Sequence, residues 1–287
     1  MTPRQIDRRQ LKAETRELLR SAQVSPRAMA ALYLGLLTVL NLADYLAGGM
    51  GAGLAGTFVS VLTTLLGIVL GAGFTLYCMA VRRGQRAEFL TLFDGFSIVG
   101  KIIGLSIVTA VFTFLWSLLL VIPGIIAAYR YRFAVYNLLE DPELGILEAL
   151  DMSKRQTYGY KGQLFVLDLS YLGWGVLASL PSIVEGVYLY LQILQDPNRF
   201  LMDPTQLIPL ISSAFLMSLL IWVWSLAVQL FYLPNYQCVE LGYFDIAKET
   251  SGVGAGARPP QDGWGGWNDG QDGGWNGRSG PDDLGGY

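Results

Sequence analysis

Long apolar stretches, nearly free of charge, alternate along the chain with short polar or charged segments. The hydrocarbon core of a bilayer is about 30 Å thick, and a helix needs about 20 consecutive apolar residues to cross it. The pattern therefore predicts an all-α fold, a polytopic helical membrane protein with six transmembrane helices. The expected spans are residues 28–47, 55–81, 97–121, 123–140, 164–191 and 206–233.

The third and fourth spans belong to one continuous apolar run, and the number of spans depends on whether that run is divided. Pro123 and Gly124 lie within it. Proline removes a helix hydrogen bond and glycine permits a turn, so we expect the chain to turn there and return. If the run is a single helix, the protein has five spans, and this is the alternative prediction. Division is favoured because it places all Lys and Arg except Arg130, Arg132 and Arg199 on the cytoplasmic side, as the positive-inside rule requires.

Amphipathic segments flank the spans on the expected cytoplasmic side. Residues 1–27 combine seven basic side chains with leucines at helical spacing. This pattern is typical of a helix that lies on the membrane surface, where anionic lipid headgroups are the expected partners. Thr2 followed by Pro3 indicates the start of that helix. Residues 141–158 begin with an Asp-Pro pair and predict a second cytoplasmic helix.

These patterns divide the chain into three parts: a basic amphipathic helix over 1–27, a helical transmembrane domain over 28–250 and a tail over 251–287. The tail is rich in Gly, Asp and Asn, with few aliphatic residues to bury, which predicts disorder. Its tryptophans either contact a partner or the membrane interface, or are simply solvated. The charge distribution predicts that both termini are cytoplasmic.

The amino-acid composition excludes several kinds of catalytic and metal-binding site. The chain contains no histidine, which excludes the usual Ser-His-Asp and Cys-His nucleophile systems and removes the commonest ligand for transition metals. Cys78 and Cys238 are too few for a disulfide framework or a cysteine-rich metal site. Only 15% of residues are charged, against about 25% in soluble domains. We therefore expect no enzymatic activity, no cofactor, no metal site and no nucleic-acid partner.

Ionisable residues within membrane spans are costly and become functional candidates for that reason. A rise of about 1.5 Å per residue places Arg132 roughly 12 Å and Asp168 roughly 8 Å from the cytoplasmic ends of neighbouring spans, so we expect them to pair. Tyr129 and Tyr136 share the helix face of Arg132, whereas Arg130 points elsewhere. Either these residues form a polar site for a lipid phosphate or an anion, or the pair is structural and Arg130 extends to lipid headgroups.

Several motifs resemble a known family. They occupy residues 77–84, 92–96, 115–131, 140–143 and 164–174, and the longest is Leu-Trp-Ser-Leu-Leu-Leu-Val-Ile-Pro-Gly-Ile-Ile-Ala-Ala-Tyr-Arg-Tyr. The chain resembles the bacterial integral membrane proteins grouped as domain of unknown function 975. The resemblance implies a multi-pass protein of the bacterial cytoplasmic membrane without an established activity. More distantly, the Pro-Gly region is similar to the membrane domain attached to some glycerophosphodiester phosphodiesterases, which is not their catalytic part.

Three functional classes are compatible with these observations. The first is a non-enzymatic scaffold or accessory factor that binds lipids or partner membrane proteins, with a homo-oligomer as one form of partner. The alternative is a small transporter or exporter component that uses the polar site between the fourth and fifth spans. A membrane-embedded enzyme is the third, and the missing histidine and the lack of a carboxylate cluster argue against it.

Overall fold

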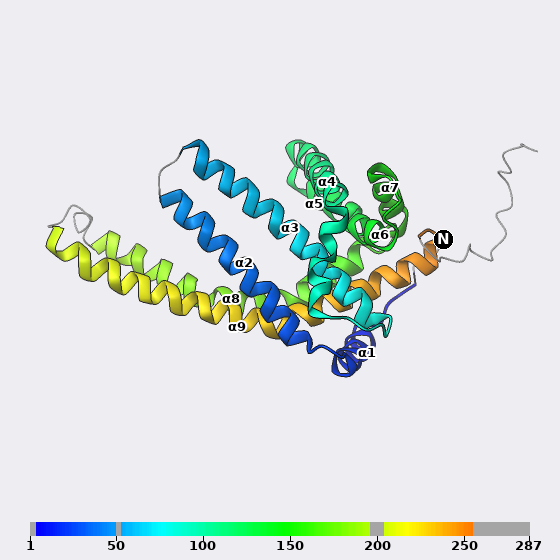
Figure 1. The fold of residues 1–287 in the computed structure, drawn as a ribbon, viewed down its shortest axis with the longest axis horizontal. Helices are drawn as coiled ribbons and strands as arrows, with labels where there is room; N and C mark the ends of the chain where they lie inside the picture. Colours follow the sequence, from blue (N-terminus) through cyan, green and yellow to red (C-terminus); the bar gives the residue numbers. More distant parts are fainter. Residues whose placement is uncertain (1–3, 50–52, 196–203, 255–287) are drawn as a thin grey trace, which may run out of the picture.

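The computed structural model describes residues 4–49, 53–195 and 204–254, and within these residues every regular element is a helix (Figure 1). The predicted all-α membrane fold is confirmed. In chain order the elements are α1 (Arg8–Ser21), α2 (Pro26–Gly49), α3 (Leu54–Arg82), the 3₁₀ helix η1 (Phe89–Ile98), α4 (Val99–Leu119), α5 (Val121–Tyr131), α6 (Ala134–Glu140), α7 (Ile146–Gln156), α8 (Lys161–Gln195) and α9 (Pro204–Ser251).

Three antiparallel hairpins dominate the molecule: α2 with α3, α4 with α5, and α8 with α9. Figure 1 shows them leaving the middle of the molecule in different directions. Their far ends carry exposed apolar side chains; Leu54 is 92% exposed and Leu118 is 74% exposed. Side chains of this kind are stable at a surface only if lipid or another protein covers them. Among the described residues, five helical segments are long and apolar enough to cross a membrane.

The three hairpins meet in a packed region that we call the base. It consists of α1, η1, α6, α7 and those ends of the other helices that pack against them. Helix α9 explains why such a region exists, because its 48 residues extend about 72 Å, more than twice the thickness of the hydrocarbon core. Its final turns leave the apolar segment and bury Val239, Leu241, Tyr243 and Phe244 in the base.

Glycine allows α3 and η1 to pack with their backbones in contact. A Cβ atom on Gly73 would lie 1.8 Å from the carbonyl oxygen of Leu92, and one on Gly95 would lie 2.7 Å from the carbonyl oxygen of Val69. Neither position tolerates a side chain unless backbone moves. This contact fixes η1, the connection between the first two hairpins, against α3.

The chain turns back before the fourth predicted span, but not where the sequence indicates. The break falls at Leu120, whose extended backbone (φ −164°, ψ 152°) separates α4 from α5. Pro123 lies in the first turn of α5, where its missing N–H group costs no helix hydrogen bond. Gly124 is required for helix contact and not for the turn, because a Cβ there would lie 2.0 Å from the Oγ atom of Ser117.

The fourth predicted span is also not a single helix, which corrects the six-span prediction. Helix α5 contains 11 residues and ends at Tyr131, and the 7-residue α6 begins at Ala134. An 11-residue helix rises only about 16 Å, half the hydrocarbon thickness. The other five predicted spans each correspond to one of the five long apolar segments. The return to the base is therefore made by two short helices.

Two predicted helix starts are wrong. The helix expected from Thr2–Pro3 begins only at Arg8, because Asp7 caps it: the Asp7 Oδ1 atom accepts the backbone N–H of Arg9 at 2.9 Å. The second amphipathic helix begins at Ile146, five residues later than its Asp-Pro signal. The predicted tail covers residues 251–287, and its residues 255–287 lie outside the described residues, while α9 continues to Ser251.

Candidate functional site

The strongest polar cluster of the described residues is centred on Arg132, at the bend between α5 and α6. Its guanidinium forms paired hydrogen bonds to Asp168 of α8, Nη1 to Oδ2 at 2.6 Å and Nη2 to Oδ1 at 2.9 Å. On its other edge, Nε donates to Oε1 of Glu240 on α9 at 2.6 Å and Nη2 donates to Oε2 at 3.0 Å. Paired bonds between guanidinium and carboxylate are the strongest class of side-chain hydrogen bond.

Tyrosine hydroxyl groups complete the hydrogen bonding of the two carboxylates. Tyr129 donates to Asp168 Oδ2 at 2.6 Å and Tyr236 donates to Asp168 Oδ1 at 2.8 Å. Tyr136 donates to Glu240 Oε1 at 2.8 Å, and the hydroxyl of Tyr136 accepts a bond from Gln237 at 3.1 Å. Tyr236 also accepts a bond from Arg132. We call Arg132, Asp168, Glu240, Tyr129, Tyr136 and Tyr236 the polar network.

The charged side chains of the polar network are largely buried. The Glu240 side chain is only 5% exposed, compared with 18% for Arg132 and 30% for Asp168. A buried charge costs several kcal/mol unless it is paired and hydrogen-bonded. Both carboxylates depend on the same guanidinium, so this single side chain joins the α5–α6 bend to α8 and α9.

The structure brings together four of the five residues singled out from the sequence. Arg132 and Asp168 are in direct contact, and Tyr129 and Tyr136 bond to the carboxylates beside them. Arg130 lies apart: its side chain forms no hydrogen bond or ion pair with the described residues, although its carbonyl oxygen accepts the Ser153 hydroxyl at 2.9 Å. Whether a ligand uses this network stays a prediction.

Sequence reasoning missed Glu240 and assigned no role to Tyr236. Both lie after residue 233, where the last predicted span ends. A signal was present, because Glu240 is a lone carboxylate flanked by Cys238, Val239 and Leu241. A single charge inside an apolar helical stretch indicates a buried partner. That partner, Arg132, lies 108 residues earlier in the chain.

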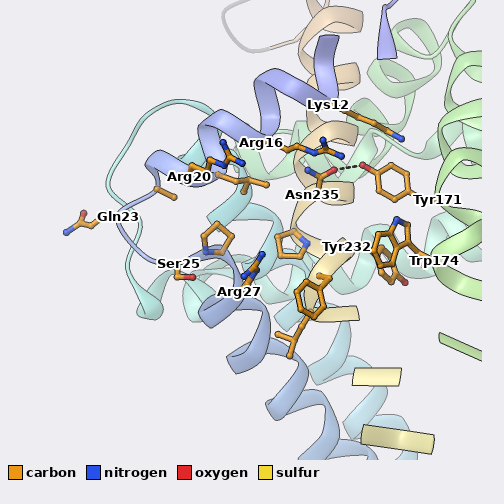
Figure 2. A pocket seen from close by; sticks show the side chains of 16 residues that line it. Lys12, Arg16, Arg20, Gln23, Ser25, Arg27, Tyr171, Trp174, Tyr232 and Asn235 are labelled. Carbon is orange, nitrogen blue, oxygen red and sulfur yellow. Dashed lines mark hydrogen bonds between the residues drawn. The ribbon is translucent and has the colours of Figure 1, made fainter. Parts of the chain in front are cut away.

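A second candidate site is a groove of about 660 Å³ between α1, the start of α2, α8 and α9 (Figure 2). We call it the basic groove. Four cationic side chains line it: Lys12, Arg16, Arg20 and Arg27. Partial burial, and then the positive charges of Arg8 and Arg16, lower the pKa of Lys12 below its ordinary value. An anion in the groove would relieve this repulsion.

Aromatic side chains form the other wall of the basic groove. Tyr171 and Trp174 come from α8 and Tyr232 from α9. The rings of Trp174 and Tyr232 stack with their centroids 6.2 Å apart. The Lys12 ammonium lies 4.2 Å from the centroid of the Tyr171 ring, a cation–π contact that holds α1 against α8. The groove therefore combines positive charge with an apolar surface.

These features define an all-α membrane protein with a polar base and apolar hairpins. Residues 117–244 match the model of the family described as "Protein of unknown function (DUF975)". The matched segment begins in α4 and ends in α9, and so contains the whole polar network. The family predicted from the motifs is confirmed over this segment, whereas the upstream motifs lie outside it. Neither the curated proteins nor the solved structures contain a match to this chain.

Proposed function

We propose that this protein is a non-enzymatic scaffold or accessory factor of the bacterial cytoplasmic membrane, which acts by binding lipids or partner membrane proteins. The observation that carries the proposal is that the hydrogen bonds of the Arg132 guanidinium are taken up within the protein. Each of its three guanidinium nitrogens bonds to a carboxylate of the protein itself. A charge fully occupied in this way holds helices together and has little capacity left for a passing substrate.

The exposed apolar side chains of the hairpins support the same proposal. Phe114, Leu118 and Leu119 on α4 are 66%, 74% and 70% exposed, and Val121 and Ile122 on α5 continue this apolar surface at 73% and 70% exposure. The α4–α5 hairpin thus presents a continuous apolar face. Lipid tails or the helices of a partner membrane protein cover such a face without any directional bond.

A shared contact with Tyr160 supports a common side for the two ends of the described chain. Residues Arg4 and Thr250 both hydrogen-bond to the hydroxyl of Tyr160, at 3.0 Å and 2.8 Å. Because the base carries most of the positive charge, we propose that it faces the cytoplasm, as the positive-inside rule requires.

A transporter or exporter component is the second candidate, and one observation favours it. The polar network contains two carboxylates and one guanidinium, so full ionisation leaves one uncompensated negative charge. Buried carboxylates with a charge surplus occur in proton and cation pathways. Such a role requires that water reach the network from both sides of the membrane at different times, which a scaffold does not need.

Accessibility of the network separates the two candidates. Cys78 and Cys238, both buried, are first replaced by alanine, and Tyr236→Cys then places one thiol in the network while its three charges remain. The protein is reconstituted in vesicles and treated with a membrane-impermeant maleimide from one side and then the other. Ser21→Cys on α1 and Gly53→Cys before α3 serve as reference thiols for the two sides.

The scaffold proposal expects the Tyr236→Cys thiol to react from the Ser21 side only, or not at all. Reaction from both sides would contradict it and would favour a transporter. Reaction of the Ser21→Cys and Gly53→Cys thiols from the same side would contradict the proposed topology.

A further inference from the structure

We propose that the basic groove is a binding site for the headgroup of an anionic phospholipid, with the acyl chains extending along the apolar surface of α2 and α9. This inference deepens the proposed function, on which it rests, by naming a site and a ligand.

The cations of the groove come from one stripe of α1 and from the start of α2. Lys12, Arg16 and Arg20 follow each other at intervals of four residues, and Figure 2 shows them along the same side of the helix, above Arg27. None of the four forms an ion pair with a carboxylate of residues 4–49, 53–195 or 204–254. Like charges four residues apart destabilise a helix. An anionic ligand removes this cost.

The groove lies where charged surface gives way to apolar surface. Phe231, at its edge, is 61% exposed, and its ring lies 5.1 Å from the Arg27 guanidinium. Trp174 is 41% exposed and Tyr232 stacks on it. Trp and Tyr are the residues that membrane proteins place at headgroup level. A soluble anion needs only the cations, whereas an amphipathic lipid uses both surfaces, and this favours the lipid.

The groove is held open by contacts that do not involve its three arginines. The Tyr171 hydroxyl donates to the side-chain oxygen of Asn235, joining α8 to α9. Lys12 donates to the Ser170 hydroxyl at 2.9 Å, which fixes α1 on α8. Behind this wall the rings of Tyr171 and Tyr236 meet at 5.1 Å, so the groove shares a wall with the polar network. Arg16, Arg20 and Arg27 remain available for the ligand.

Size and charge indicate which headgroup fits best. A volume of about 660 Å³ lies in the range of small-molecule sites and exceeds what a single phosphate needs. Four cations match two phosphate groups better than one. Basic pockets between transmembrane helices on the cytoplasmic side bind diphosphate lipids such as cardiolipin. We therefore expect cardiolipin to bind more tightly than phosphatidylglycerol, and phosphatidylcholine to bind weakest.

The test uses the full chain in a neutral detergent and measures bound lipid by native mass spectrometry during titration with cardiolipin, phosphatidylglycerol or phosphatidylcholine. The groove variant is Arg16→Gln/Arg20→Gln. The matched control is Arg9→Gln/Arg86→Gln, which removes the same charge from two exposed arginines outside the groove. A separate titration with pyrophosphate supplies the same charge without acyl chains.

The groove variant is expected to bind cardiolipin about 30-fold more weakly, because each cation near an anionic headgroup contributes a factor of about five. The control is expected to stay within about threefold of the parent. Equal weakening of both variants would overturn the proposal in favour of general surface attraction, and no weakening of the groove variant would also overturn it. Pyrophosphate binding as tight as cardiolipin binding would reassign the groove to a soluble anion.

This outcome is independent of the maleimide test. A failed lipid titration leaves the one-sided labelling of Tyr236→Cys, and with it the scaffold proposal, in place. Conversely, two-sided labelling rejects the scaffold but does not alter the affinity of the groove for lipid.

Discussion

The base and the far ends of the hairpins are stabilised by different means. In the base, Glu240 and Tyr136 are at most 5% exposed. Every charged atom of the polar network there has a hydrogen-bond partner. At the hairpin ends the largest side chains, such as Leu54 and Leu118, are mostly exposed. The base therefore depends on particular contacts, whereas the hairpin ends depend on their surroundings.

Substitutions should therefore affect stability differently in the two regions. A hairpin end in lipid needs only an apolar helix of the right length, because lipid tails adapt to many side chains. The base has close backbone contacts and shared charges, and these tolerate neither extra atoms nor missing partners.

The largest effect is expected for Arg132→Gln. It leaves Asp168 and Glu240 without their common cation, and loss of one partner from a buried ion pair costs about 3–5 kcal/mol. Thermal unfolding in detergent measures the loss. Phe114→Ala on the exposed face of α4 is the comparison and should change stability by about 0.5 kcal/mol or less. Equal destabilisation by the two substitutions would remove the distinction between base and hairpin.

The two carboxylates are expected to differ from each other. Asp168→Asn leaves Arg132 and Glu240 as a neutral pair, and Asp168 is the more exposed carboxylate. Glu240→Gln removes the deeper one. We expect Glu240→Gln to destabilise by about 1–3 kcal/mol and Asp168→Asn by less. A larger loss for Asp168→Asn, in the same unfolding measurement, would show that burial does not set the order.

Gly73→Ala is expected to destabilise by about 1–3 kcal/mol, because the new methyl group meets the Leu92 carbonyl oxygen and η1 must move. Gly173→Ala is the control: no atom lies within 4 Å of its Cβ position, and alanine favours a helix over glycine. Unfolding curves in detergent should move in opposite directions. Stabilisation by Gly73→Ala would mean that α3 and η1 do not pack as closely as described.

The smallest effect is expected at the start of α1. Asp7→Ala removes the cap and should cost about 1 kcal/mol of helix stability, seen as faster amide hydrogen exchange in residues 8–12. Arg9→Ala keeps the backbone N–H that bonds to Asp7 and removes only an exposed side chain, so it should leave exchange in this segment nearly unchanged. Unchanged exchange after Asp7→Ala would indicate that α1 is held by its contacts with α8 and α9 alone.

The sequence predicted the hairpin regions well and the base only in part. Apolar runs define the long helices because a bilayer demands a fixed length of hydrophobic helix. The Arg132–Asp168 contact was foreseeable because both charges lie inside apolar segments. The turn at Leu120 was placed three residues late, since Pro123 fits the first turn of α5 as well as it would fit a break.

The rest of the base was beyond sequence reasoning for a physical reason. Glu240 meets Arg132 only because α9 continues as one helix past the apolar segment, and a periodic pattern does not show how far a helix extends into a packed region. The α5–α6 bend and the Gly73–Leu92 contact are tertiary features as well. Likewise, the basic groove needs α1, α2, α8 and α9 together, although the spacing of Lys12, Arg16 and Arg20 was visible from the start.

Because Glu240 also bonds to Arg132, replacing Arg132 and Asp168 together does not remove the whole network. Replacing Arg132 and Asp168 together, the natural test for an isolated pair, still leaves the Glu240 carboxylate buried without a cation. The neutral form of the network therefore requires Arg132→Gln/Asp168→Asn/Glu240→Gln. In this triple variant all three charged groups of the polar network are neutral.

The central claim is that these three charges act as one structural unit, and the unfolding temperature of the triple variant tests it most directly. Measured in the same detergent, the triple variant should be more stable than Arg132→Gln alone, although it carries two further substitutions. Coupling of this sign arises only between groups that interact. A triple variant as unstable as the sum of its single substitutions would contradict the claim and would leave the three charges as independent groups.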